Sequence, residues 1–564
     1  MQNTNKIHIQ HLAEICAQKG MEQVVLSPGS RCAPLVIAFN RHASIKCYTI
    51  VDERSAAFFA LGLAQQSGKP VGLVCTSGSA VLNYAPAVAE AFYQKIPLVL
   101  MTADRPNEWI DQGENQSIQQ FEVFKNYIKK SYQLPVNATE KEDVWFSNRL
   151  VSEAINKANF PDFGPVHINI PLREPLYDLT AESIEKPKIV DLVKSDFSLA
   201  KEEMDTLKKD WNQATKKLII VGGQKQKNAA IEKALQLYAN NPDVVILKES
   251  ISNIETENTF AQIDPLIELI QKNKLTGFVP DIILTFGNGV VSKKLKFWLR
   301  QENIKAHWHI SYSYEHWDNF QALSKVLKMN VSSFLTAIHS TENSNSDYYK
   351  VWNSLNKKVA SFTDSYIEKS EYADFKVFKI LSKSFPENAN IQFGNSTPVR
   401  YANLLALNNN LLINANRGVS GIDGQVSAAL GASNINDKLT VCITGDLAMM
   451  YDSNALWNKY LHSKFKVILI NNNGGNIFRI IPGPNKLEEL ETYFETKNTY
   501  EAKHLASLHG LKYFQVKQED DLEIMLEAFY AENEQAALLE INTNGELSAD
   551  VLKNYFVELV KTVK

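Results

Sequence analysis

Short apolar runs that end in glycine and polar residues recur along the whole chain, and helical patterns separate them. The runs are rich in Val, Ile and Leu with little polar alternation, which is typical of strands buried on both faces of a sheet. Strands that alternate with helices in this way form parallel sheets covered by helices. The sequence therefore predicts an α/β fold built from doubly wound, mainly parallel sheets.

The runs fall into three groups, which predict three domains in a chain of 564 residues. Two charged stretches with helical patterns join the groups, and we place the domains at residues 1–185, 186–350 and 351–564. The predicted strands lie, in chain order, in "QVVLSPGSR", "CYTIVDER", "VGLVCTSGS", "PLVLMTADRP" and "PVHINIP", then "KLIIVGGQ", "DVVILKES", "DIILTFGNG" and "AHWHIS", then "ANIQFGNS", "LLINANRG", "LTVCITGDLA", "FKVILINNNGG" and "ALLEINT".

Charge and cysteine usage exclude several classes of protein. A net charge of -4 argues against a surface for nucleic acid or anionic membranes. No apolar run reaches the roughly 18 residues that cross a bilayer, and the N-terminus lacks the basic start and apolar core of a signal peptide. The five cysteines are scattered and form no CxxC pair, so we expect a reducing, cytoplasmic location without disulfides or a zinc site.

Polar residues follow two predicted strands of the third group. In "TVCITGDLAMMYDSNALWN", Gly445 and Asp446 come directly after an apolar strand and before a helix. The next strand, "FKVILI", ends in a run of asparagines that includes Asn472. Ligands of α/β sheets bind beyond the carboxyl ends of the strands, so both side chains should face one crevice. Asp446 suits either a helix cap or a Mg²⁺ ligand, because Mg²⁺ prefers oxygen ligands.

This order of elements resembles the diphosphate-binding motif of thiamine diphosphate enzymes. The resemblance implies that Mg²⁺, or Mn²⁺ in its place, is held by Asp446, the side chain of Asn472 and the main-chain oxygen of Gly474. It also places Gly445 and Leu447 beside the diphosphate, although the family commonly has glycine where Leu447 stands.

A thiamine diphosphate enzyme also needs a glutamate beside the aminopyrimidine ring to activate the cofactor. In "CYTIVDERSAAFFALGLAQ", Glu53 stands at a strand end before an apolar helix. Apolar neighbours raise the pKa of a carboxyl group, which suits proton exchange with the ring. The alternative is that Asp52 and Glu53 merely favour the helix N-terminus, where negative charge is stabilised.

Further blocks resemble one branch of that family, the 2-succinyl-5-enolpyruvyl-6-hydroxy-3-cyclohexene-1-carboxylate synthases of menaquinone biosynthesis. They are "LSPGSRCAPL", "TSGSAVLNYAPAVAEA", "LVLMTADRPNEWIDQGENQSI", "GNSTPVR" and "NRGVSGIDG", with "VSKKLKFW" in the middle group. The resemblance implies decarboxylation of 2-oxoglutarate and conjugate addition of the succinyl carbanion equivalent to isochorismate. It also implies a homodimer or homotetramer, with each active site between the first domain of one chain and the third domain of its partner.

Both substrates are dicarboxylates, so a suitable pocket needs several cations, and arginine is favoured for bidentate contacts. In the first group the resemblance implies isochorismate contacts for Ser30 and Arg31 and a substrate contact for Arg105. Gln116 matches a polar group over the reacting centre, which makes it a catalytic candidate. A helix cap at Ser30 and a plain loop arginine at position 105 are the structural alternatives.

The other implied contacts come from the second and third groups. Lys293 and Lys294 match a basic substrate-binding pair, with an exposed helix face as the alternative. Ser396, Arg400 and Arg417 match the 2-oxoglutarate side, and Ser396 also lies next to the cofactor. The same resemblance sets three apolar residues against the cofactor and substrate, although core packing is the usual role of such residues. These are Ile477 and Phe478 for the cofactor, and Phe478 and Ile481 for the substrate.

Three other functions are compatible with parts of the sequence. Another thiamine diphosphate-dependent 2-oxoacid decarboxylase, or an acetolactate synthase-like carboligase, shares the cofactor motif. A nucleotide-binding oxidoreductase is suggested by "IIVGGQKQKN", although this stretch lacks the GxGxxG spacing. A scaffold that kept the fold without catalysis is the third, and the presence of Glu53, Asp446 and Asn472 argues against it.

Overall fold

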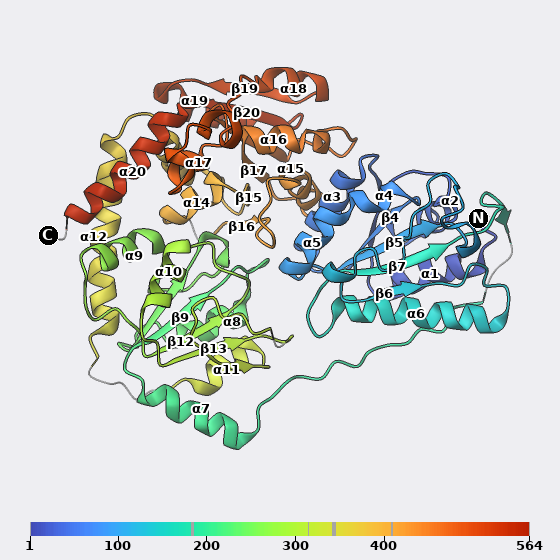
Figure 1. Cartoon of the computed structure of the whole chain (residues 1–564), viewed down its shortest axis with the longest axis horizontal. Helices are drawn as coiled ribbons and strands as arrows, with labels where there is room; N and C mark the ends of the chain where they lie inside the picture. Colours follow the sequence, from blue (N-terminus) through green and yellow to red (C-terminus); the bar gives the residue numbers. More distant parts are fainter. Residues whose placement is uncertain (1, 182–184, 314, 341–345, 408–409, 563–564) are drawn as a thin grey trace. The chain divides into compact units, whose positions relative to one another are not determined.

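The computed structural model describes residues 2–181, 185–313, 315–340, 346–407 and 410–562. Within these residues the chain forms three six-stranded sheets and one two-stranded sheet (Figure 1). The two short strands β1 (Asn3–Thr4) and β8 (Leu179–Thr180) pair antiparallel. In the six-stranded sheets, every strand pair whose register is defined is parallel. The predicted α/β fold with three doubly wound parts is confirmed.

The first sheet has the strand order β3-β2-β4-β5-β7-β6. Its strands are β2 (Gln23–Leu26), β3 (Lys46–Thr49), β4 (Val71–Cys75), β5 (Leu98–Asp104), β6 (Ser131–Gln133) and β7 (Val166–Pro171). One face packs against α1 (Ile7–Gln18), α2 (Ala33–Asn40) and α6 (Lys141–Asn159). On the other face lie α3 (Glu53–Ser67) and α5 (Ala85–Gln94), with α4 (Ser79–Asn83) before α5.

The strand order of the first sheet reverses between β2 and β4, because β3 lies on one side of β2 and β4 on the other. Ligand sites of doubly wound sheets lie at such a reversal. The loops after β2 and β4 are "SPGSR" and "TSGS", so the fold brings these two predicted blocks together. The "TADRP" block follows β5, the next strand across the sheet.

The second sheet has the order β11-β10-β9-β12-β13-β14. Its strands are β9 (Lys217–Val221), β10 (Val244–Lys248), β11 (Thr259–Phe260), β12 (Ile282–Phe286), β13 (Ala306–Ile310) and β14 (Leu323–Leu327). One face packs against α7 (Lys201–Gln213), α8 (Ala229–Gln236) and α11 (Val331–Ile338). The other side carries α9 (Ile263–Lys272), α10 (Lys293–Gln301) and the long α12 (Tyr348–Lys369).

The third sheet has the order β16-β15-β17-β18-β20-β19, with a reversal between β15 and β17. Its strands are β15 (Asn390–Phe393), β16 (Leu412–Ala415), β17 (Thr440–Gly445), β18 (Phe465–Asn471), β19 (Lys512–Val516) and β20 (Ala537–Asn542). The accompanying helices are α13 (Asp374–Ser384), α14 (Thr397–Leu404), α15 (Gln425–Ser433), α16 (Asp446–Tyr451), α17 (Ile477–Ile480), α18 (Ala502–His509), α19 (Leu522–Ala531) and α20 (Gly545–Lys561).

The contacts within the chain define two compact units. The first comprises Met1–Lys194, Asn416–Thr440 and Met450–Phe465, and the second comprises Ser195–Ala415, Val441–Met449 and Lys466–Lys564. Part of the segment 351–564, including α15, therefore groups with the first sheet. The domain boundaries at 185/186 and 350/351 stay predictions, because the sheets fix only where each core lies.

Two glycines hold the first unit together where α3 crosses α15. A Cβ at Gly62 would lie 1.9 Å from the carbonyl oxygen of Ala428, and one at Gly431 would lie 2.0 Å from that of Phe59. Real Cβ atoms do not approach a carbonyl oxygen so closely, so the two backbones are in contact only because both positions are glycine. The helix that begins at Glu53 is thereby fixed along its length.

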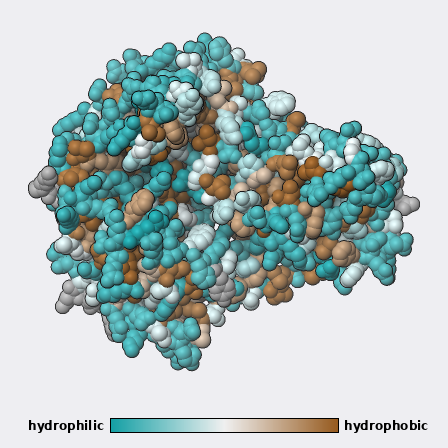
Figure 2. All heavy atoms as spheres, viewed as in Figure 1, coloured by the Kyte–Doolittle hydropathy of each residue, from teal (hydrophilic) through white to brown (hydrophobic). Residues whose placement is uncertain are grey.

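Among the described residues, every helix is too short or too polar to cross a bilayer. The face drawn in Figure 2 is mainly hydrophilic, with smaller apolar groups between the polar residues. Large apolar side chains that are exposed in the first unit include Trp109, Trp145 and Tyr177.

We expect Gly62→Ala to lower the free energy of unfolding by about 1–3 kcal/mol, the usual effect of overpacking. The added methyl group forces α3 and α15 apart, since its three nearest atoms belong to the backbone of α15. Urea denaturation followed by circular dichroism measures the change. Gly289→Ala is the control, because its Cβ would have no atom within 4 Å and the stability should stay near that of the wild type. Equal stability of the two variants would contradict the close crossing.

Candidate active site

The ends of β17 and β18 carry the predicted metal ligands. The two strands are neighbours in the third sheet, so Asp446 and Asn472 follow adjacent strand ends. Asp446 begins α16 and is 3% exposed, and Asn472 is 7% exposed. The turn after β18 has left-handed backbone at Asn473 (φ 65°) and a φ of 150° at Gly474. Gly474 is required there, because a Cβ would lie 2.8 Å from the carbonyl oxygen of Glu495.

Asp446 is a buried carboxylate held by neutral donors. Its Oδ1 accepts the main-chain N–H of Leu447 (2.7 Å), and its Oδ2 accepts the side-chain amide of Asn498 (3.2 Å). Burial raises the pKa of Asp446 to about 6. Among the described residues, no lysine or arginine forms an ion pair with it. A buried carboxylate without a cation favours binding of one, and a carboxylate, an amide oxygen and a main-chain oxygen suit Mg²⁺. The residues fit the predicted ion.

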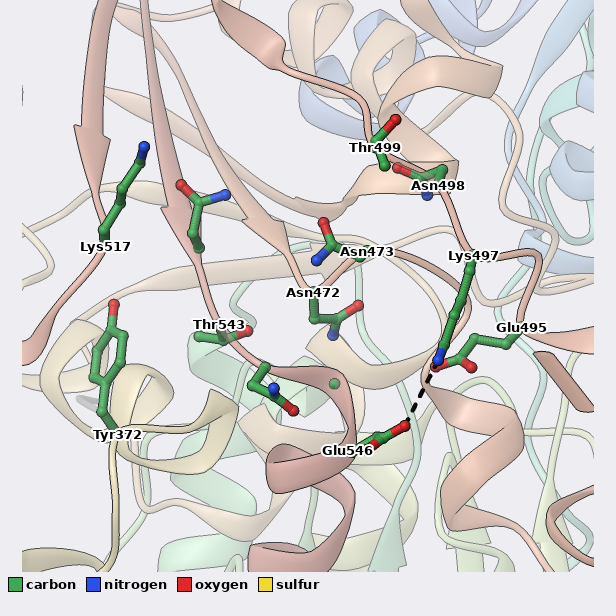
Figure 3. Close-up of a pocket in the computed structure, with 13 residues that line it drawn as sticks. Tyr372, Asn472, Asn473, Glu495, Lys497, Asn498, Thr499, Lys517, Thr543 and Glu546 are labelled. Atoms are coloured by element: carbon green, nitrogen blue, oxygen red, sulfur yellow. Dashed lines mark ion pairs between the residues drawn. The ribbon is translucent and has the colours of Figure 1, made fainter.

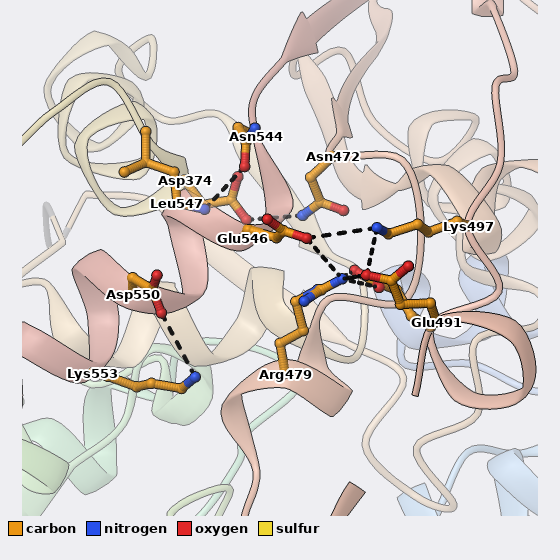
Figure 4. Close-up of polar contacts among 11 residues, drawn as sticks. Asp374, Asn472, Arg479, Glu491, Lys497, Asn544, Glu546, Leu547, Asp550 and Lys553 are labelled. Carbon is orange, nitrogen blue, oxygen red and sulfur yellow. Dashed lines mark hydrogen bonds and ion pairs between the residues drawn. The ribbon is translucent and has the colours of Figure 1, made fainter. Parts of the chain in front are cut away.

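A segment that the sequence did not single out folds over this turn. The main-chain N–H of Asn498 donates to the carbonyl of Asn473 (3.1 Å), and that of Gly475 donates to the carbonyl of Glu495 (2.6 Å). Arg479 holds the same segment through an ion pair of 2.7 Å with Glu491 (Figure 4) and another of 2.7 Å with Glu495. No local motif marks Asn498, because its partner Asp446 is 52 residues away in the chain.

A cavity of about 720 Å³ opens beside the turn (Figure 3). Its walls come from the turn after β18, from the segment around Asn498 and from the start of α20. The lining side chains include Asn472, Asn473, Glu495, Lys497, Asn498 and Asn544. The cavity is large enough for a small-molecule ligand and is mostly polar in its residues.

The apolar residues that follow the turn are not part of a closed core. Ile477, Phe478 and Ile481 are each half-buried, and the ring of Phe478 lies 5.7 Å from that of Phe494. A pure core role would bury them fully. Their partial exposure leaves apolar surface next to the predicted metal site, in agreement with a contact to a cofactor or substrate.

Ser396 and Arg400 follow β15, the neighbour of β17. Ser396 has a left-handed backbone (φ 73°), a conformation that non-glycine residues adopt at a cost and that is enriched at functional sites. Arg400 lies on α14, and burial lowers its pKa while the carboxylates of Asp264 and Glu249 act in the opposite direction. Its Nε is buried without a hydrogen-bond partner in the structure.

Lys293 and Lys294, the basic pair at the start of α10, lie in different environments. Lys294 forms an ion pair with Glu268, and its ammonium lies 4.2 Å from the ring centroid of Phe556. Lys293 is exposed. The preceding loop is fixed by Glu249, which accepts the main-chain N–H groups of Val291 (2.6 Å) and Ser292 (2.7 Å). Burial raises the pKa of Glu249 to about 7.

The loops after β2, β4 and β5 gather the predicted residues of the first sheet. Arg31 is 6% exposed and donates to the carbonyl of Leu172 (2.9 Å). Burial, together with the nearby charge of Arg105, lowers the pKa of Arg31. Ser30 is exposed. Gln116 has a left-handed backbone (φ 53°), and a Cβ at Gly78 would lie 3.1 Å from its Cα. One sheet edge thus carries the guanidinium groups of Arg31 and Arg105, the hydroxyl of Ser30 and the amide of Gln116.

The structure separates the roles of Asp52 and Glu53. Asp52 is the N-cap of α3, because its Oδ1 accepts the main-chain N–H of Ser55 (3.0 Å). Its Oδ2 accepts the amide of Asn454 (2.6 Å). Glu53 is the first helical residue and is half-buried, and burial raises its pKa. The capping role belongs to Asp52, which leaves Glu53 available for another function.

Arg417 sits in a turn that a buried glutamate fixes. Glu90 of α5 is 1% exposed and accepts the main-chain N–H groups of Gly418 (2.6 Å), Val419 (2.7 Å) and Ser420 (3.3 Å). A Cβ at Gly418 would lie 2.5 Å from the carbonyl oxygen of Glu90. Glu90 was not predicted from the sequence, although a lone charge in the apolar helix "APAVAEAFYQ" is a signal of a buried, hydrogen-bonded carboxylate.

The glycine turn of the second sheet has no room for a nucleotide. A Cβ at Gly222 would lie 1.8 Å from the carbonyl oxygen of Asn288, so the turn after β9 packs directly on the turn after β12. The cavity beside it measures about 30 Å³, the room of about one water molecule. The oxidoreductase interpretation of "IIVGGQKQKN" therefore has no support in the geometry.

The chain is similar to thiamine pyrophosphate enzymes over most of its length. The chain matches "Thiamine pyrophosphate enzyme, N-terminal TPP binding domain" over residues 9–123, "Middle domain of thiamine pyrophosphate" over 194–392 and "Thiamine pyrophosphate enzyme, C-terminal TPP binding domain" over 394–541. It is 40% identical to the 2-succinyl-5-enolpyruvyl-6-hydroxy-3-cyclohexene-1-carboxylate synthase of Flavobacterium johnsoniae, with 98% of each chain covered. Proteins of the same name from Flavobacterium psychrophilum (41%, 98% of each chain) and Christiangramia forsetii (42%, 96% of this chain and 97% of that one) are similarly close.

We expect Glu90→Gln to loosen the turn that carries Arg417. The amide presents an NH₂ group to main-chain donors, which leaves buried N–H groups unpaired at a cost of about 1–3 kcal/mol. Hydrogen exchange should lose protection at Gly418, Val419 and Ser420, and urea denaturation should show the lower stability. Glu142→Gln, on an exposed face of α6, is the control and should change neither. Unchanged exchange at the three amides in Glu90→Gln would show that the carboxylate does not hold the turn.

Proposed function

The chain belongs to the 2-succinyl-5-enolpyruvyl-6-hydroxy-3-cyclohexene-1-carboxylate synthases of the thiamine diphosphate enzymes, and on that basis we propose how its residues act. It is a thiamine diphosphate-dependent transferase of menaquinone biosynthesis. It decarboxylates 2-oxoglutarate and adds the succinyl unit to isochorismate in conjugate fashion. The observation that carries this conclusion is the 40% identity, along 98% of the chain, to the synthase of that name from Flavobacterium johnsoniae.

In the proposed metal site, Asp446, the amide oxygen of Asn472 and the main-chain oxygen of Gly474 hold Mg²⁺ or Mn²⁺. The burial of Asp446 without a cationic partner among the described side chains supports this set. Gly445 and Leu447 lie at the start of α16, beside the proposed diphosphate position. When bound, thiamine diphosphate supplies a nucleophilic carbon and accepts the electrons released as a 2-oxoacid loses CO₂.

Glu53 is the proposed proton-exchanging group. Burial raises the pKa of the Glu53 carboxyl, which favours its protonated form and suits proton exchange with a ring nitrogen of the cofactor. The capping contact of Asp52 keeps the start of α3 in place, so the carboxyl of Glu53 keeps its position. Gln116 is the proposed polar group over the reacting carbon, and its strained backbone fits a position set by function.

The cations are proposed to bind the carboxylates of the two substrates. Arg31 and Arg105 lie close together at one sheet edge, and Ser30 beside them offers a hydroxyl for isochorismate. Arg400, Arg417 and Ser396 are proposed for 2-oxoglutarate. For Lys294, the ion pair with Glu268 neutralises part of the charge. The exposed Lys293 is therefore the stronger candidate of the pair for a substrate contact.

Ile477, Phe478 and Ile481 are proposed to form the apolar wall of the site. Their half-buried side chains exclude water from one side of the reacting carbon, which strengthens the electrostatic contacts there. The proposed assembly is a homodimer or homotetramer with active sites between chains. Exposed Trp109, Trp145 and Tyr177 in the first unit offer apolar surface for such an interface. The proposed location is the cytoplasm.

Product analysis tests the reaction directly. With thiamine diphosphate, Mg²⁺, 2-oxoglutarate and isochorismate, we expect CO₂ and the succinylated adduct in equal amounts, measured by mass spectrometry and CO₂ release. Pyruvate in place of 2-oxoglutarate should give little CO₂, because the cations match a second carboxylate. Equal turnover of pyruvate without an isochorismate adduct would indicate a different decarboxylase or carboligase of the same family.

We expect Glu53→Gln to bind thiamine diphosphate as the wild type does but to lose turnover by about 10²- to 10⁴-fold, the usual contribution of a general acid or base. The amide keeps the size of the side chain and removes the exchangeable proton. Calorimetric titration measures cofactor binding, and the product assay gives kcat. Asp52→Asn, which keeps a capping oxygen, should retain most of the activity. Full activity in Glu53→Gln would remove Glu53 from the mechanism.

A further inference from the structure

Asp374 is a fully buried carboxylate with partners just after β18, just after β20 and on α20. It is the first residue of α13 and is 0% exposed. Its Oδ1 accepts the hydroxyl of Thr543 (2.6 Å), and its Oδ2 accepts the side-chain amide of Asn472 (2.9 Å). Its own main-chain N–H donates to Oγ of Ser548 (3.0 Å). Figure 4 shows the contact between Asp374 and Asn472.

The contact with Asp374 decides which end of the Asn472 amide faces which way. The two ends of an asparagine amide have nearly the same shape, so packing alone does not distinguish them. In the structure Nδ2 of Asn472 donates to Oδ2 of Asp374, so the NH₂ end of the amide faces the carboxyl group. The oxygen end then points away from Asp374. In Figure 3, Asn472 lies at the wall of the cavity, between Thr543 and the segment of Lys497.

The proposed metal site requires the oxygen end of the Asn472 amide. Asn472 and Asp446 follow neighbouring strands of one sheet. The amide oxygen is a hard, neutral ligand of the kind that Mg²⁺ binds beside a carboxylate. A reversed amide would instead present two N–H groups to a cation, which repels it.

We propose that Asp374 is a positioning residue of the metal site, which holds the side-chain amide of Asn472 so that its oxygen is presented to the divalent cation. This inference rests on the proposed assignment of Asn472 as a metal ligand. Asp374 does not itself touch the cation in this arrangement. Its effect is on affinity, because it removes the cost of turning and fixing the amide when the ion binds.

The rival explanation is that Asp374 only ties α13 to β20 and α20. Its contacts with Thr543 and Ser548 serve that purpose whichever way the amide of Asn472 faces. The two explanations differ in one respect. If the orientation of the Asn472 amide matters, metal binding should survive an exchange of the carboxylate and the amide between positions 374 and 472. If Asp374 only links the helices and strands, the carboxylate must stay at position 374.

The experiment uses the full chain with saturating thiamine diphosphate and Mn²⁺ as the probe, followed by electron paramagnetic resonance. We expect Asp374→Asn to weaken Mn²⁺ binding by about 10- to 100-fold, the usual effect of losing a partner of a metal ligand. Asn472→Asp should also weaken it, because two carboxylates then face each other across the hydrogen bond. Thr543→Val is the matched control, since it removes a different donor to Asp374 and leaves Asn472 in place.

The exchanged pair, Asp374→Asn with Asn472→Asp, is the decisive variant. Its asparagine NH₂ donates to the new carboxylate, whose second oxygen faces the cation, so Mn²⁺ binding should recover relative to either single variant. This comparison holds even if Asp374→Asn alone folds poorly. No recovery in the exchanged pair, or a loss in Thr543→Val as large as in Asp374→Asn, would overturn the positioning role. Asn472→Ala with wild-type Mn²⁺ affinity would instead overturn the metal assignment itself.

Discussion

Parallel strands bring their carboxyl ends to one edge of a sheet, and the arrangement of the functional side chains follows from this constraint. Arg31, Glu53 and Arg105 each follow a strand of the first sheet, while Asp446 and Asn472 follow adjacent strands of the third. The strand order reverses between β2 and β4, and again between β15 and β17. Ligand sites of doubly wound sheets lie at such reversals. The chemistry therefore gathers in loops, while the strands supply a rigid base.

Loops at a sheet edge need partners for their polar groups, and in this protein buried carboxylates provide them. Glu90 accepts three main-chain N–H groups of the turn that carries Arg417, and Glu249 accepts two from the loop before Lys293. Asp374 accepts the amide of Asn472. Burying a carboxylate is costly unless it is hydrogen-bonded, so each acid is stable only when its loop is in place. The acid and the loop thus fix each other.

The strand pattern in the sequence predicted the inner strands and missed four at the edges. These are β6, β11, β14 and β19, and each is the last strand on its side of a sheet. Edge strands have one neighbour and more solvent contact, so they need fewer apolar residues: the burial of Leu323–Leu327 and Lys512–Val516 is mostly partial. Ion pairs also could not be predicted from the sequence. The pair between Lys294 and Glu268, for example, joins residues that are 26 positions apart on different helices.

The sequence by itself determined the class of fold, the strand ends that carry the metal motif and the resemblance to a cofactor family. These features are local, since a buried strand, a turn and a motif are each written within a few consecutive residues. Only the tertiary structure decided which partner each functional side chain has. Asn472 meets Asp374 across 98 positions of the chain, and Gly418 meets Glu90 across 328. Such pairs leave no local pattern, because they form only when distant segments pack, and the direction of the Asn472 amide follows from that packing.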